Sequence, residues 1–136
     1  MDSNLYPYLF FDGNAREAMR FYREALGGEL TVMTYGETGV TGPEADQVMH
    51  ATLASEAGYT IMASDTGPGQ EYRPGRNVAL CLGGDDGERL RGYWQRLAAG
   101  ATVTVPLEQQ FWGDVYGSLV DRFGVSWMVD ISAGSS

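Results

Sequence analysis

The sequence has little of several residue types on which common protein functions depend. Among its 136 residues are one cysteine, Cys81, and one histidine, His50. A single cysteine excludes an intrachain disulfide and a zinc site built from several thiolates. No apolar run approaches the roughly 20 residues of a membrane-spanning helix, and the first residues lack the basic start and apolar stretch of a signal peptide. We therefore expect a cytoplasmic protein that has no membrane partner.

Positive charge is also scarce. The chain has 9 Lys and Arg against 18 Asp and Glu, which gives a formal net charge of −9. A surface this negative repels phosphate backbones, so we expect no nucleic-acid partner. Hydrophobic residues make up 43% of the chain, an ordinary share for a globular protein. Length and composition together predict one globular domain with one core.

The order of the predicted elements repeats once along the chain. Asn14 with Glu17, and later Asp85 with Glu88, are typical of helix starts. Apolar residues then recur with helical spacing, and glycines follow each stripe. The stripes are Ala18, Phe21, Tyr22, Ala25 and Leu26, then Leu90, Tyr93, Trp94, Leu97 and Ala98. Predicted strands cover 5–11, 29–35, 48–54 and 59–63 in the first half, and 77–82, 101–105, 115–120 and 125–131 in the second. The pattern predicts a duplicated strand-helix-strand-strand-strand unit.

Several motifs strengthen this interpretation and point to a family. They are Pro7-Tyr8-Leu9-Phe10-Phe11-Asp12-Gly13-Asn14, Met49-His50-Ala51, Trp112-Gly113-Asp114 and Asp121-Arg122-Phe123-Gly124-Val125-Ser126-Trp127. They resemble motifs of the vicinal oxygen chelate superfamily, which includes glyoxalase I, extradiol dioxygenases and bleomycin-resistance proteins. The resemblance is closest to its PhnB-like branch.

The resemblance implies an α+β fold of two tandem βαβββ modules. These would form a curved eight-stranded mixed sheet, with helices on the convex face and a cavity on the concave face. Residues 1–136 would be a single vicinal oxygen chelate domain, with module one at about 1–66, a linker at about 67–76 and module two at about 77–132. The resemblance also implies a homodimer with twofold symmetry.

Strand alternation separates the residues that meet the helices from those that face the cavity. For example, His50 and Thr52 alternate with Ala51 and Leu53, so the polar pair is expected to face the cavity. The cavity would be lined by aromatic, thioether and hydroxyl groups, a composition typical of small-molecule pockets. The expected ligand-binding residues are Tyr6, Tyr8, Phe10, His50, Thr52, Met62, Asn77, Trp112, Tyr116, Ser118 and Met128.

Metal-dependent members of the superfamily hold a divalent ion on the first and last strands of each module. By motif, the first-strand positions fall at or beside Tyr6 and at Asn77, and the last-strand positions fall at Met62 and Met128. A hard divalent ion prefers carboxylate or imidazole ligands to a phenol, an amide and two thioethers. We therefore expect no metal site and no cofactor, and a divalent metal is the less favoured alternative.

Three functions are open at this point. The first is a metal-independent, PhnB-like or glyoxalase-like small-molecule binding protein. The second is a glyoxalase- or dioxygenase-like enzyme, a lyase or oxidoreductase, in which His50 acts as a catalytic base or metal ligand. In that case His50 would be the catalytic residue; otherwise it is a strand histidine satisfied by a neighbouring hydroxyl or carbonyl. The third is an orphan homodimer whose cavity is filled by its own side chains.

Overall fold

The chain forms two compact units, each with its own sheet and helix. The computed structural model describes residues 3–67 and 70–133. The first unit runs to Pro74 and the second begins at Gly75, so the boundary falls in the expected linker, which is described except for residues 68–69.

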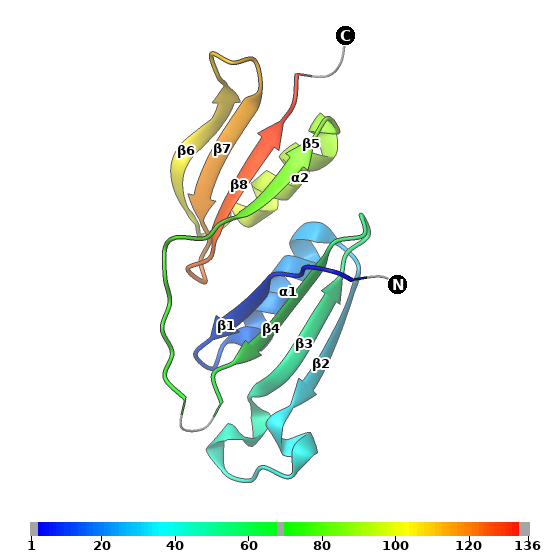
Figure 1. Ribbon diagram of the computed structural model, residues 1–136, viewed down its shortest axis with the longest axis vertical. Helices are drawn as coiled ribbons and strands as arrows, with labels where there is room; N and C mark the ends of the chain where they lie inside the picture. The colour runs from blue at the N-terminus through cyan, green and yellow to red at the C-terminus, as the bar shows by residue number, and fades with distance from the viewer. Residues whose placement is uncertain (1–2, 68–69, 134–136) are drawn as a thin grey trace. The chain divides into compact units, whose positions relative to one another are not determined.

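The first unit contains β1 (Tyr8–Phe11), α1 (Ala15–Leu26), β2 (Glu29–Thr34), β3 (Val48–Ala54) and β4 (Thr60–Asp65), with 3-10 turns η1 (Tyr35–Thr38) and η2 (Pro43–Asp46) (Figure 1). The second contains β5 (Leu80–Gly84), α2 (Gly87–Leu97), β6 (Thr102–Gln109), β7 (Val115–Val120) and β8 (Ser126–Ile131).

The two units share one topology. The strand order is β1-β4-β3-β2 in the first sheet and β5-β8-β7-β6 in the second. In each sheet the first strand pairs in parallel with the last, and the other neighbours are antiparallel. This equivalence confirms the predicted α+β fold of two tandem βαβββ modules. A concave cavity formed jointly by both modules stays a prediction.

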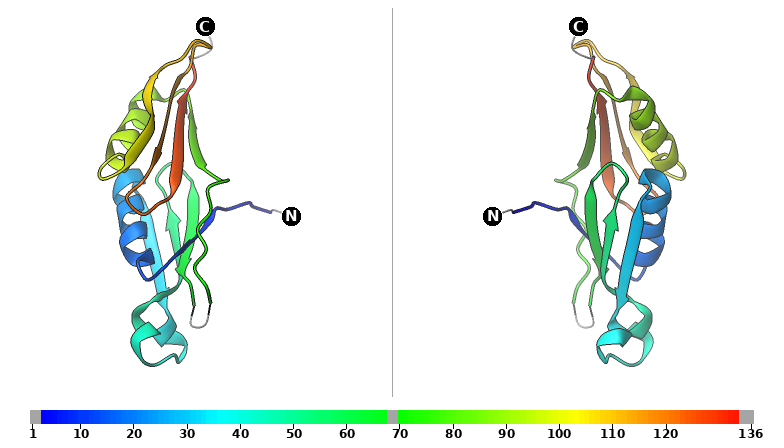
Figure 2. Two further views of the ribbon diagram at one scale, coloured as in Figure 1. Left: turned by 90° about the vertical axis from the view of Figure 1, so that its left-hand side faces the viewer. Right: turned by 90° about the vertical axis from the view of Figure 1, so that its right-hand side faces the viewer.

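Each sheet buries one face against its own helix. In the side-on views of Figure 2, α1 lies along one face of the first sheet, and α2 lies along one face of the second sheet. The strand residues on these faces and the helix residues that pack against them are almost fully buried and form the two cores. They include Met19, Tyr22, Leu53 and Ala63 in the first unit, and Leu97, Leu119, Trp127 and Val129 in the second. The opposite face of each sheet is available for function.

The helix starts differ from the sequence prediction. Asn14 lies at the N-cap of α1, but its side chain makes no capping hydrogen bond. Instead, the buried carboxylate of Asp65 accepts from the Ala15 amide at 2.9 Å and from the Val48 amide at 2.8 Å. A residue distant in sequence thus satisfies the helix terminus and ties it to β3. In α2 the N-cap is Asp86 rather than Asp85.

Several strand boundaries also differ from the prediction. β1 begins at Tyr8 rather than at residue 5, and β4 continues to Asp65 rather than ending at residue 63. β5 begins at Leu80 rather than at residue 77, because its pairing with β8 begins at Trp127. β6 continues through Pro106 to Gln109, where the sequence predicts a loop. β6 lies at an edge of its sheet and its register shifts on both sides of Val105, so it tolerates a proline that a central strand would exclude.

A buried aspartate fixes the turn between β7 and β8. Asp121 is only 4% exposed. One carboxylate oxygen accepts from the amides of Phe123 and Val125 at 2.8 and 3.1 Å. The other accepts from the Trp127 indole N–H at 2.8 Å. The same carboxylate therefore holds the turn and anchors the largest fully buried side chain.

In the part of the chain that the structure describes, no helix combines the length and the apolar character needed to span a membrane.

Candidate functional site

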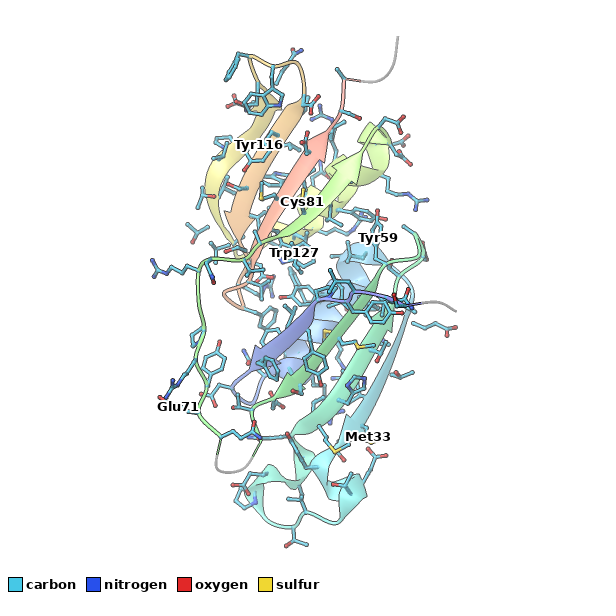
Figure 3. All side chains as sticks on the ribbon, in the orientation of Figure 1. Met33, Tyr59, Glu71, Cys81, Tyr116 and Trp127 are labelled. Carbon is cyan, nitrogen blue, oxygen red and sulfur yellow. The ribbon has the colours of Figure 1, made fainter. Side chains whose placement is uncertain are left out.

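The open face of the second sheet carries a row of polar and thioether side chains. On β7, Gly117 and Leu119 are buried toward α2, whereas Tyr116 and Ser118 lie on the other face. On β8, Ser126 and Met128 alternate in the same way with the buried Trp127. Ser118 pairs with Met128, so β7 and β8 present these groups side by side. Figure 3 labels Tyr116 and Trp127 on these strands.

A hollow of about 370 Å³ lies on this unit. It extends from the segment before β5 across β8 and β7 to the edge strand β6. Its lining residues are Arg76, Asn77, Val78, Ala79, Thr104, Tyr116, Ser118, Leu119, Val120, Ser126, Trp127 and Met128. The volume lies at the lower end of the range of ligand pockets in proteins, about 300–1,000 Å³.

The hollow brings together part of the residue set expected from the sequence. Asn77, Tyr116, Ser118 and Met128 all line it. Trp112 does not line it, but its ring centroid lies 6.0 Å from that of Tyr116, and 5.0 Å from that of the fully exposed Phe111. The loop before β7 therefore carries an aromatic group next to one wall of the hollow.

The lining also includes residues outside the expected ligand-binding set, and Thr104 and Arg76 are the two with the most bearing on its chemistry. Thr104 is hydrogen-bonded to Ser118 across the β6–β7 pair, and alternation along β6 could have placed it on this face. Arg76 precedes β5, within a glycine- and proline-rich segment that shows no periodicity. No sequence signal could have assigned Arg76 to the hollow.

The open face of the first sheet holds the other expected residues. Tyr8 Oη lies 3.1 Å from His50 Nδ1, and His50 Nε2 lies 2.9 Å from Thr52 Oγ1. The Phe10 ring lies beside that of Tyr8, at 5.1 Å between centroids. Met62 pairs with Tyr8 across β1 and β4. Tyr6 precedes β1, is 39% exposed, and joins none of these contacts.

Both nitrogens of His50 have hydroxyl partners. A neutral imidazole donates from one nitrogen and accepts at the other, so one of the two hydroxyl groups of Tyr8 and Thr52 must donate to the ring and the other must accept from it. The ring nitrogen that carries the lone pair is therefore already hydrogen-bonded to one of these hydroxyls. The geometry thus matches the description of a strand histidine satisfied by neighbouring hydroxyls.

The strand register shows which residues lie beside the two methionines of the last strands. Tyr8 pairs with Met62 and Cys81 pairs with Met128, whereas the expected first-strand metal positions, at or beside Tyr6 and at Asn77, lie outside β1 and β5. Burial, with a smaller effect of Asp130, raises the pKa of the Cys81 thiol, which opposes the thiolate form that binds metals. A phenol, a thiol and two thioethers do not fit a divalent ion. Within residues 3–67 and 70–133, no group of three or more His, Cys, Asp and Glu side chains could hold one.

A carboxyl pair lies near the end of β8. Asp130 pairs with Tyr116 and is hydrogen-bonded to the side chain of Asp114. Burial, and then this hydrogen bond and the charge of Asp114, raise the pKa of Asp130 above its usual range. The Oδ1 atom of Asp130 is buried and has no hydrogen-bond partner among the described residues. Two carboxyl groups can share a hydrogen bond only if one is protonated, so this pair holds a proton more readily than an ordinary aspartate.

The fold and this site geometry define the class of the protein. Two tandem βαβββ modules, each with a helix on one face of its sheet and with its first and last strands paired in parallel, are the architecture of the vicinal oxygen chelate superfamily. A similar fold occurs in the crystal structure of a glyoxylase/bleomycin resistance protein/dioxygenase domain from Frankia sp. EAN1pec, with a TM-score of 0.66 and 18% identity over 100% of this chain and 96% of that one.

Within this class, the chain belongs to the family described as 3-demethylubiquinone-9 3-methyltransferase, whose model matches residues 3–130. It is 30% identical to Protein YjdN of Escherichia coli (strain K12), over 93% of this chain and 94% of the relative. It is 34% identical to protein PA1353 of Pseudomonas aeruginosa, whose crystal structure matches with a TM-score of 0.86 over 96% of this chain and 98% of that one. A putative 3-demethylubiquinone-9 3-methyltransferase, PhnB protein, from Bacillus cereus matches with a TM-score of 0.75 and 22% identity, over 96% of this chain and 100% of that one. These matches place the chain in the PhnB-like branch.

Proposed function

We propose that the protein binds a small organic molecule in the hollow of its second unit and does so without a resident metal ion. The observation that carries the proposal is the hollow itself: about 370 Å³, lined by apolar, hydroxyl, amide and guanidinium groups together. Small-molecule sites have this composition, with apolar walls for affinity and a few polar groups for orientation. The thioethers of Met62 and Met128, and the phenol and thiol that pair with them across the strands, support binding without a metal.

Methyl transfer is not part of the proposal, although the family description names it. A methyltransferase must hold a methyl donor and an acceptor together. The hollow of about 370 Å³ lies near the lower limit for one drug-sized ligand. A single small molecule is therefore the occupant that the volume favours.

The experiment is a thermal-shift screen of a small-molecule library, followed by isothermal titration of each hit. Ser126 lines the hollow and is half-buried, so Ser126→Phe should fill the hollow and abolish binding. Val103→Phe adds the same ring on β6 at an exposed position outside the hollow, on the side of the strand that pairs with the buried Leu119, and it should bind as the wild type does. Hits that bind Ser126→Phe with unchanged affinity would refute this location.

The metal-free part of the proposal has a separate test. Protein stripped with EDTA should bind each hit with the same affinity as protein supplied with Ni²⁺, Mn²⁺, Fe²⁺ or Zn²⁺. Titration of these ions alone should show no tight stoichiometric site. Binding that depends on one equivalent of a divalent ion would contradict the proposal.

A second candidate is an enzyme in which His50 moves a proton. The observation that favours it is the Tyr8–His50–Thr52 chain, in which Tyr8 is 40% exposed on the open face of the first sheet. Activity on glutathione hemithioacetals or catechols that is lost in His50→Ala, with circular dichroism unchanged, would support this candidate. Equal activity of both proteins would exclude His50 as the base.

The homodimer is a further proposal, which rests on the family likeness. Twofold pairing is the commonest oligomeric arrangement of soluble proteins. Sedimentation velocity at micromolar concentration should give a mass twice that of the chain, and a monomer mass would contradict it.

A further inference from the structure

We propose that the hollow of the second unit selects small organic carboxylates and that Arg76 is the residue that binds the carboxylate group. This inference rests on the proposed function, because it names the ligand class of the same hollow. Three observations support the inference. The lining carries a positive charge, the Arg76 guanidinium has no ion-pair or hydrogen-bond partner in the described part of the chain, and other hydrogen-bond donors lie on the same lining.

The lining has the opposite charge balance from the chain as a whole. The chain has twice as many acidic as basic residues, 18 against 9. The twelve lining residues include one arginine and no aspartate or glutamate. A cleft lined by one sign of charge raises the local concentration of ligands of the other sign. The charge of this lining is positive, so it attracts anions, whereas the chain as a whole carries a net negative charge that repels them.

The guanidinium of Arg76 has no internal carboxylate partner. Other arginines do have such partners: Arg73 pairs with Glu71 at 2.6 Å and Arg89 with Asp86 at 3.5 Å. Among residues 3–67 and 70–133, no ion pair or hydrogen bond engages the Arg76 side chain. The planar fork of an arginine fits a carboxylate through two parallel hydrogen bonds. Arg76 therefore offers such a fork at the hollow, whereas the nearby Arg73 does not.

The remaining groups fit the rest of such a molecule. The amide of Asn77 and the hydroxyls of Tyr116 and Ser126 are hydrogen-bond donors on the lining. The hydrogen bond between Thr104 and Ser118 uses one of their two hydroxyl hydrogens, so the other can reach a ligand. The apolar part of the lining is Val78, Ala79, Leu119, Val120, Trp127 and Met128. An anionic head with a short apolar body is complementary to this arrangement.

The single cation favours a monoanion over a phosphate dianion. One arginine balances one negative charge, and a dianion would keep an unbalanced charge inside a chain of formal net charge −9. Phosphate-binding sites usually supply several cations or backbone N–H groups. The ligand class is therefore carboxylate rather than phosphate.

The test is isothermal titration with matched charged and neutral probes: benzoate and hexanoate, their amides benzamide and hexanamide, and phenyl phosphate. We expect the wild type to bind each carboxylate at least about tenfold more tightly than its amide and than phenyl phosphate. Arg76→Ala should weaken carboxylate binding by about tenfold to hundredfold, the range for loss of a charged hydrogen-bonding group, and should leave amide binding unchanged. Arg73→Ala removes the same charge from the same segment, outside the hollow, and should bind as the wild type does.

The outcomes separate this inference from the proposed function. Equal affinities for carboxylates and amides in the wild type, with both lost in Ser126→Phe, would overturn carboxylate selection and leave the hollow as a binding site. An equal loss in Arg76→Ala and Arg73→Ala would overturn the role of Arg76, because it would show a general charge effect. Tighter binding of phenyl phosphate, or no binding of either carboxylate at millimolar concentration, would overturn the ligand class.

Discussion

The buried Asp121 carboxylate provides the sharpest test of how the second unit is held together. It accepts three hydrogen bonds, from the Phe123 and Val125 amides and from the Trp127 indole. It is 4% exposed and Trp127 is 1% exposed, so water cannot replace the indole partner. β8 carries both Trp127 in the core and Ser126 and Met128 on the hollow. Loss of these bonds should therefore destabilise the unit that contains the proposed site.

The magnitude follows from the partners that each substitution removes. In Asp121→Asn the amide oxygen can still accept from the two backbone N–H groups, but the amide nitrogen then faces the Trp127 N–H, and two donors cannot bond. The loss of this charged hydrogen bond should lower the free energy of unfolding by about 1.5–3 kcal/mol. Asp121→Ala removes the carboxylate that all three donors bind. It should lower the free energy of unfolding by about 3–5 kcal/mol.

Urea unfolding followed by tryptophan fluorescence and by far-ultraviolet circular dichroism measures this loss. Asp85→Asn is the matched control, because it makes the same charge change at an exposed position in the same unit, where Asp86 and not Asp85 caps the helix. The control should stay within about 0.5 kcal/mol of the wild type. An Asp121→Asn variant as stable as Asp85→Asn would refute the assigned role of the carboxylate.

Two further predictions concern packing and pH in the same unit. A Cβ atom at Gly117 would lie 2.8 Å from the Trp94 ring and 2.9 Å from the Leu107 Cα, so Gly117→Ala should lower stability by about 1–3 kcal/mol in thermal unfolding. Gly83→Ala is the control, because its Cβ would meet only the Asp130 carbonyl oxygen, at 3.5 Å. It should change the stability by less than about 0.5 kcal/mol. Equal losses of stability in the two variants would contradict the role of close packing at Gly117. Because the pKa of Asp130 is raised in the folded state, the unfolded chain ionises first as pH rises. The contribution of this group to stability is thus full below its ordinary pKa and is lost as pH rises through the raised value. Urea unfolding between pH 4 and pH 7 should show that the free energy of unfolding falls less with rising pH in Asp130→Asn than in the wild type. Identical pH dependence of the two proteins would argue against the carboxyl pair.

The parts of the fold that depend on local pattern could be predicted from the sequence. The duplicated order of elements follows from two helical stripes and from strands with a period of two. The same alternation separates His50 and Thr52 from the buried Ala51 and Leu53. These features need only neighbouring residues, because side-chain direction along a strand is fixed by the backbone.

The features that the sequence did not predict depend on contacts between distant segments. Asn14 and Glu17 have the spacing of a capping box, but Asp65 satisfies the start of α1 from the end of β4. Pro106 is a local signal for a loop, yet the edge position of β6 lets the strand continue through it. Such competition between local preference and tertiary pairing is decided only in the folded chain.

The candidate site follows the same division. Tyr116, Ser118 and Met128 could be assigned to one face because they lie on regular strands. Arg76 could not, because it lies in an irregular segment whose path is set by the pairing of β5 with β8. The residue that decides the proposed ligand class is therefore one that the sequence alone does not reveal.

Native mass spectrometry of EDTA-treated protein after exposure to a bacterial small-molecule extract would test the central claim most directly. We expect that the wild type retains an organic molecule with no metal ion, that Ser126→Phe retains none, and that Val103→Phe behaves as the wild type does. Two results would contradict the claim of metal-free binding in the hollow. In one, the protein retains the organic molecule only after one equivalent of a divalent ion is added. In the other, Ser126→Phe retains the molecule as well as the wild type does.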